Sequence, residues 1–84
     1  MNRQQRQTLN AIFSTPTPTT LEWRRIEALF IALGAVVIEG RGSRVRFELR
    51  GVVATFHRPH PQKEAKSYQV RDARRFLEQA GIQP

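Results

Sequence analysis

The chain has 84 residues, which is enough for one small domain and leaves no room for a second. It contains no cysteine, which excludes disulfides, thiolate metal sites and thiol nucleophiles. Fourteen Lys and Arg against seven Asp and Glu give a net charge of +7, so the expected partner is a polyanion, with nucleic acid first and an acidic protein as an open alternative.

The first ten residues lack the apolar core of a signal peptide, and no apolar run approaches the roughly 18 residues that cross a bilayer. We therefore expect a cytoplasmic protein with no membrane partner. Residues Asn2 to Phe13 are polar except near their end, which predicts a short helix that docks by its last turn. The alternating prolines of STPTPTT predict an extended linker. We expect residues 1–18 to form an arm and linker, and residues 19–84 to form the domain.

The next stretch predicts a core helix followed by a strand. Thr19 and Glu22 have the spacing of a capping box, and Gly34 supplies a left-handed stop. Apolar residues at helical spacing lie between them: Leu21, Ile26, Leu29, Phe30 and Leu33. Ala35 to Glu39 is short and β-branched, which is typical of a strand.

A hairpin is the clearest pattern in the chain. Ser43 to Leu49 and Val52 to His57 both alternate apolar and polar residues, and Arg50-Gly51 lies where a tight turn needs positive φ. Pairing Leu49 with Val52 sets the register and turns six side chains to the core: Val45, Phe47, Leu49, Val52, Ala54 and Phe56. The same register puts Arg44 opposite His57 on the exposed side.

A final helix follows the prolines of RPHP, which end the last strand. Ser67 is its expected cap, and its apolar stripe is Val70, Ala73, Phe76, Leu77 and Ala80. The predicted fold is therefore α+β, with a helix, a three-stranded antiparallel sheet and a helix, preceded by a helical extension. Both helices cover one sheet face, and the exposed group around Arg44 lies on the other.

This order, with GRGSRVRFEL, then FHRPHPQKE, then VRDARRFLEQAGI, resembles the HicA toxins of bacterial toxin-antitoxin pairs. The resemblance covers roughly residues 20–82. It implies a fold like that of double-stranded-RNA-binding domains, metal-independent cleavage of mRNA, and neutralisation by a HicB antitoxin. The implied partners are mRNA and a HicB-like protein, with no cofactor, and we expect the free chain to be monomeric.

One position departs from the family pattern. HicA toxins usually carry their catalytic His directly after the Gly-Ser pair, and here Arg44 follows Gly42-Ser43. We hypothesise that His57, across from Arg44, takes over the proton transfer while Arg44 stabilises the phosphate. The alternative is that His57 is an ordinary exposed strand residue near a basic patch.

Other basic and polar residues form a candidate track for an RNA backbone. The RNA-binding candidates are Arg41, Ser43, Arg46, Arg58, His60, Lys63 and Lys66, and Arg71, Arg74 and Arg75 extend the track or meet an acidic antitoxin. The alternative is a solvated basic face that keeps the domain soluble. No metal site is expected from two histidines without clustered carboxylates, and no catalytic triad can be assembled around Ser43.

Trp23 and Tyr68 are candidates for contact with RNA bases. Either ring could stack on an RNA base, while Trp23 at a helix start is equally suited to cover the core edge. Three functions therefore stay open: an mRNA endoribonuclease toxin, a non-catalytic RNA-binding module of the same fold, and a domain that mainly docks an antitoxin.

Overall fold

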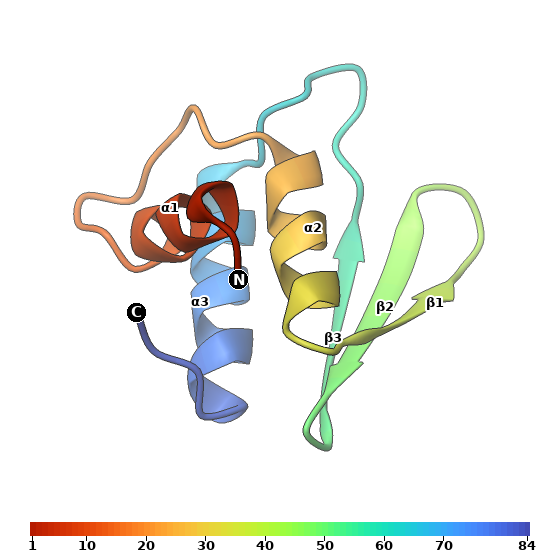
Figure 1. The fold of residues 1–84 in the computed structure, drawn as a ribbon. Coiled ribbons are helices and arrows are strands. Elements are labelled where there is room, and N and C mark those ends of the chain that lie inside the picture. The colour runs from red at the N-terminus through yellow and green to blue at the C-terminus, as the bar shows by residue number, and fades with distance from the viewer.

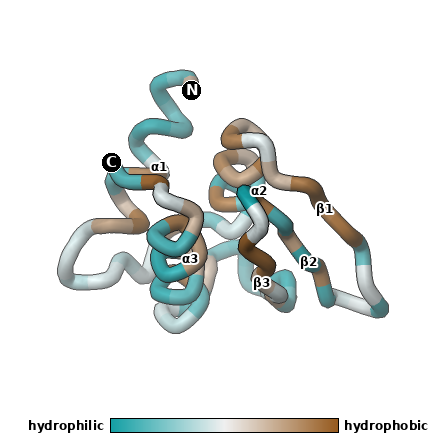
Figure 2. Tube along the Cα trace, turned by 90° about the horizontal axis from the view of Figure 1, so that it is seen from below, coloured by the Kyte–Doolittle hydropathy of each residue, from teal (hydrophilic) through white to brown (hydrophobic).

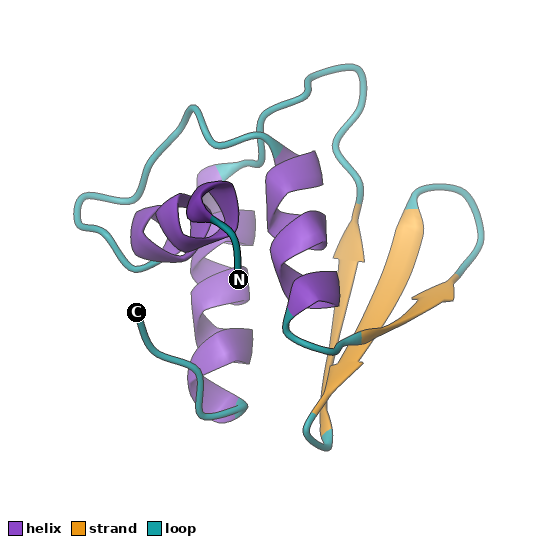
Figure 3. Cartoon of the chain, in the orientation of Figure 1, coloured by secondary structure: helices purple, strands orange, loops and turns teal.

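Three helices lie on one side of a three-stranded sheet (Figure 1). The computed structural model describes all 84 residues. Its elements are α1 (Arg3–Ile12), α2 (Trp23–Ala32), β1 (Val36–Glu39), β2 (Arg44–Leu49), β3 (Val52–His57) and α3 (Ser67–Gln79). The second sheet face carries no helix (Figure 3). The predicted α+β class and the order helix, three strands, helix are confirmed. None of the helices has the length and apolar character needed to cross a membrane.

The sheet is antiparallel in the order β1-β2-β3, with the register that the alternation predicts. Leu49 pairs with Val52 across the turn, and at the other end Arg44 pairs with His57. Arg50 and Gly51 both have positive φ, at 51° and 80°, as a two-residue hairpin turn requires. Figure 2 shows the hydrophobic and hydrophilic positions that alternate along β2, while β1 is mostly hydrophobic.

Aromatic rings fill the layer between sheet and helices. The ring of Phe30 on α2 meets that of Phe47 on β2 and that of Phe76 on α3, with both pairs of centroids 5.0 Å apart and nearly perpendicular. Such edge-to-face ring pairs stabilise the fold beyond what the burial of their apolar surface contributes. Trp23 is also buried here, with its ring 5.1 Å from that of Phe56. Trp23 therefore covers the core edge and is not free to stack on RNA.

Helix α1 docks through its last turns, as predicted. Leu9 and Ile12 lie in the same buried cluster as the side chains of α2 and α3. The guanidinium of Arg74 on α3 closes the end of α1, since its Nε donates to the backbone oxygen of Ile12 at 2.9 Å and its Nη2 to that of Ser14 at 2.8 Å. These donors satisfy carbonyls that a helix end leaves unpaired. Arg74 is thus engaged within the fold, unlike the exposed Arg71 and Arg75.

Both predicted helix caps are wrong. Helix α2 begins at Trp23 with Glu22 as its N-cap residue, and no side chain caps it. The preceding segment stays extended because Ala65 donates to the backbone oxygen of Leu21, at 2.8 Å, and Glu22 forms a bridge with Glu64. Helix α3 has Lys66 as its N-cap residue instead of Ser67.

Candidate nucleic-acid interface

The start of β2, the end of β3 and the β3–α3 connection meet at one end of the sheet, uppermost in Figure 1. Most of the candidate residues come from these segments. Antiparallel pairing brings the two strand ends together, although Ser43 and His57 are 14 positions apart in the sequence. The backbone N–H of Arg58 donates to the backbone oxygen of Ser43 at 2.8 Å. The fold thus gathers side chains that are far apart along the chain.

His57 and Arg44 share one exposed place on the open sheet face. They are paired across β2 and β3, and both are exposed. Hydrogen-bonded and non-hydrogen-bonded residue pairs alternate along an antiparallel ladder. Because the neighbouring pair of Ser43 and Arg58 is hydrogen-bonded, Arg44 and His57 form a non-hydrogen-bonded pair, in which side chains lie close together. A guanidinium and an imidazole therefore face the same solvent region.

Ser43 completes this group. Its Oγ lies 3.3 Å from Nδ1 of His57, within hydrogen-bond distance. A ring nitrogen held in this way fixes the orientation of the imidazole and leaves Nε2 free to exchange a proton with a substrate. Sequence reasoning placed Ser43 and His57 in the site separately, and the structure brings them into contact.

Gln69 supports His57 from behind, and sequence reasoning missed it. Its side chain is only 3% exposed, and its Nε2 donates to the backbone oxygen of His57 at 2.6 Å. Its Oε1 accepts the backbone N–H of Lys66 at 3.0 Å. One buried amide therefore ties the end of β3 to the start of α3. The one sequence signal for this role is that Gln69, a polar residue, directly precedes Val70 at the start of the apolar helix stripe.

Arg58 is held by two carboxylates. Its Nε lies 2.6 Å from Oε1 of Glu27 on α2, and its Nη1 lies 2.7 Å from Oε1 of Glu39 at the end of β1. These hydrogen bonds raise the pKa of Arg58 and lower that of Glu39. Trp23 adds a bond from Nε1 to Glu27 at 2.6 Å. The guanidinium of Arg58 is therefore engaged in joining α2 to the sheet, in contrast to its expected place in the RNA track.

A hollow of about 450 Å³ adjoins His57. Its lining comes from the end of β3, the connection that follows and the first turn of α3: His57, Arg58, Pro59, His60, Pro61, Gln62, Lys66, Tyr68 and Gln69. Both histidines of the chain thus border one open space. Tyr68 is half exposed beside it, where a base could stack on its ring.

The remaining candidates lie around this hollow or on the open face. Arg41 is exposed in the loop before β2. Lys63 is next to the start of α2, where its backbone oxygen accepts the N–H of Trp23 at 2.9 Å. Arg46 follows Arg44 on the open face, and its Nη2 is 3.5 Å from a carboxylate oxygen of Glu48. Four of these candidates are exposed cations without a paired carboxylate: Arg41, Arg44, Lys63 and Lys66.

The sequence profile of the family described as HicA toxin of bacterial toxin-antitoxin matches residues 23–82, more than two thirds of the chain. The chain belongs to the HicA toxin family. No curated protein and no solved structure matches it. The matched part contains α2, the sheet and α3, which together form the site around His57. Helix α1 lies outside the matched residues, although its apolar side chains share the core of this HicA toxin.

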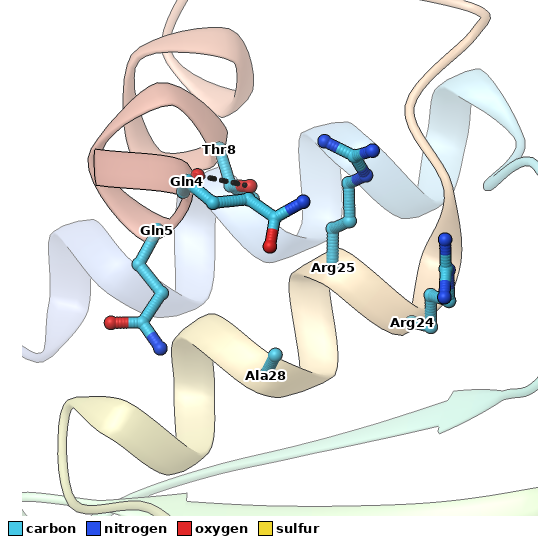
Figure 4. Close-up of a pocket in the computed structure, with 6 residues that line it drawn as sticks. All are labelled: Gln4, Gln5, Thr8, Arg24, Arg25 and Ala28. Atoms are coloured by element: carbon cyan, nitrogen blue, oxygen red, sulfur yellow. Dashed lines mark hydrogen bonds between the residues drawn. The ribbon is translucent and has the colours of Figure 1, made fainter. Parts of the chain in front are cut away.

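A second hollow of this HicA toxin, of about 180 Å³, lies between α1 and α2 (Figure 4). Gln4, Gln5, Thr8, Arg24, Arg25 and Ala28 line it. It holds two arginines but no imidazole or carboxylate that could transfer a proton. Arg24 is also paired with Glu22, with Nε 2.8 Å from a carboxylate oxygen, and this bond lowers the pKa of Glu22. This hollow therefore lacks the imidazole groups that border the hollow beside His57.

Proposed function

We propose that this HicA toxin is a metal-independent endoribonuclease that cleaves mRNA and so inhibits translation in the cytoplasm. Membership of the family supports the role of toxin. The observation that supports the chemistry is the contact of Ser43 Oγ with His57 Nδ1, at 3.3 Å, directly beside Arg44. This cluster offers a proton acceptor and a cation at one exposed place, which are two of the groups that RNA cleavage needs.

The proposed reaction uses the 2′-hydroxyl of the RNA as nucleophile. Nε2 of His57 takes the 2′-hydroxyl proton as the 2′-oxygen attacks the adjacent phosphorus. The bond from phosphorus to the 5′-oxygen breaks, and that oxygen receives a proton from the second imidazole of the hollow, His60. The products are a 2′,3′-cyclic phosphate and a 5′-hydroxyl end. The guanidinium of Arg44 stabilises the extra negative charge on the phosphate oxygens.

Binding of the RNA strand rests on cations around the same end of the sheet. Arg41, Arg46, Lys63 and Lys66 flank the cluster and contact phosphates, while Tyr68 stacks on a base. The net charge of +7 favours this use. The hydroxyl of Ser43 orients the ring of His57 and donates a hydrogen bond to a phosphate oxygen of the bound RNA.

A second candidate function is supported by Arg44 itself. Because Arg44 stands where HicA toxins usually carry their catalytic His, the chain could bind RNA without cutting it. The same surface then serves as a non-catalytic RNA-binding module. Both candidates share the partner that the family implies, a HicB-like antitoxin that neutralises the toxin.

Induced expression in bacteria separates these functions. Growth arrest with loss of mRNA, abolished by H57A, supports the endoribonuclease. RNA binding by the purified protein without growth arrest supports the binding module. The matched control is R71A, because Arg71 is exposed on α3 and takes no part in the proposed reaction. Full toxicity of H57A would overturn the proposed mechanism.

A further inference from the structure

The two edges of the sheet differ in how they are protected. β1 and β3 are the edge strands, since the order is β1-β2-β3. β1 has only four residues and ends in the charged Glu39, while β3 has six residues, VVATFH. Natural sheets protect their edges with charges, prolines, bulges or very short strands. From Val52 to Phe56, β3 has neither a charge nor a proline, so its edge is an open pairing site.

The register shows which backbone groups this edge presents. Leu49 pairs with Val52 next to the turn, and Arg58 bonds to Ser43 at the other end. Hydrogen-bonded pairs alternate with non-bonded ones in an antiparallel ladder. The N–H and C=O groups of Val53 and Thr55 therefore point away from β2, as does the N–H of His57.

The edge also lies in a groove. Helix α3 runs beside β3 (Figure 2), and a hollow of about 190 Å³ separates Val53 and Thr55 from Asp72, Arg75 and Gln79 of that helix. Tyr68 continues this line of side chains at a spacing of three to four residues and borders the hollow beside His57. Val53 and Tyr68 are both more than half exposed. An edge strand facing a helix across a groove is the geometry in which domains add an extended peptide to a sheet.

Charge decides which occupant fits. A second copy of this chain would bring another charge of +7 to the same edge, which repels association. An acidic segment is attracted instead, above all at the end of the groove where His57, Arg44 and Lys66 lie. A β3-sized segment of six residues spans about 20 Å, so it reaches from the turn to this cationic end.

We propose that the free edge of β3 binds an extended, acidic segment of the antitoxin as a fourth strand of the sheet. This inference rests on the proposed function, since it concerns the partner that function requires. The backbone of Val53 and Thr55 supplies the hydrogen bonds, and the side chains of α3 contact alternate residues of the added strand. Because β3 ends at His57, the segment runs past the catalytic cluster and blocks the RNA from reaching it.

Amide hydrogen exchange on the complex of this chain with a HicB-like antitoxin tests the proposal. We expect the amides of Val53, Thr55 and His57 to exchange at least tenfold more slowly in the complex than in the free toxin. The outward amides of β1, those of Val37 and Glu39, are the internal control and should not change. A complex that forms but leaves the β3 amides unprotected overturns the docking mode alone, while the absence of any complex overturns the proposed partner as well.

A pair of variants gives a second test. T55P removes an N–H that points to the edge without breaking a bond to β2, and T55V keeps that N–H. We expect T55P to weaken antitoxin binding more than tenfold while RNA cleavage persists, and T55V to bind as the unmodified chain does. Equal binding by both variants contradicts the proposal. Concentration-dependent protection of β3 in the toxin alone would assign the edge to a second copy and overturn it too.

Discussion

Gln69 donates a hydrogen bond from its buried side-chain amide to the backbone oxygen of His57, across 2.6 Å. The bond joins the last residue of β3 to the first turn of α3. It fixes the strand end from the side opposite to Ser43, which contacts the imidazole of His57 at 3.3 Å. The position of the proposed catalytic group thus depends on a buried side chain of the neighbouring helix.

The first prediction concerns Gln69. Replacing it with Leu leaves the backbone oxygen of His57 and the N–H of Lys66 without their partner inside the protein. We expect a loss of about 1 to 3 kcal/mol in the free energy of unfolding, because a buried polar group without a hydrogen bond is costly. Urea unfolding followed by circular dichroism measures this loss. Gln79, which is exposed on the same helix, offers the control substitution Q79L, and equal stability of the two variants would contradict the role of Gln69.

The second prediction concerns Arg44. We expect R44A to lower the rate of RNA cleavage by about a hundredfold or more, because removing one donor to a developing charge typically has that effect. R44K should recover only part of the rate, since an ammonium cannot form the two parallel bonds of a guanidinium. Arg71, exposed on α3, gives the control R71A. Cleavage by R44A at the original rate would remove Arg44 from the mechanism.

The third prediction concerns salt. If the cations near His57 bind phosphates, salt competes with these contacts and RNA affinity falls as salt is added. About three contacts to a single strand give roughly a twentyfold loss between 50 and 200 mM salt. Fluorescence anisotropy with a labelled RNA measures the slope. Lys66, an exposed cation of the hollow, should contribute to it, so K66Q makes the slope shallower. An affinity that does not respond to salt would identify the basic surface as a solubility feature.

The fourth prediction concerns Arg58 and acid. Arg58 lowers the pKa of Glu39 by hydrogen bonding, so the folded state holds the ionised carboxylate more strongly than the unfolded chain does. The resulting stability is present at neutral pH and is lost as the pH falls through the lowered pKa of Glu39.

We therefore expect R58M to be less stable than the unmodified chain at pH 7, and the difference to shrink as the solution is acidified below the ordinary range of glutamate. Thermal melts across that pH range provide the measurement, and R71M on the exposed face of α3 is the control. A stability difference that stays constant down to strongly acidic pH would show that the pair of Arg58 and Glu39 contributes nothing to it.

The sheet could be predicted from sequence because its pattern is local. Alternation with a period of two, together with Gly51 in a two-residue turn, determines which residue of β3 faces each residue of β2. The place of Arg44 opposite His57 follows directly. The buried stripe of α3 follows in the same way from a period near 3.6.

The contacts that hold the site could not be predicted, because they join residues that no local pattern relates. Arg58 donates a hydrogen bond to Glu27, which is 31 positions away in the sequence, and Arg74 donates one to Ile12, which is 62 positions away. The capping prediction at Thr19 failed for a related reason. Pairing of Leu21 with Ala65, from the distant β3–α3 connection, keeps that segment extended until Trp23.

The most direct test of the account is RNA cleavage by the purified toxin in the presence of a metal chelator, compared between the unmodified chain and H57A. We predict that the unmodified chain cuts RNA to 2′,3′-cyclic phosphate ends, and that H57A is at least a hundredfold slower while binding RNA equally well. Equal cleavage rates for the two proteins, or no cleavage by either, would contradict the account.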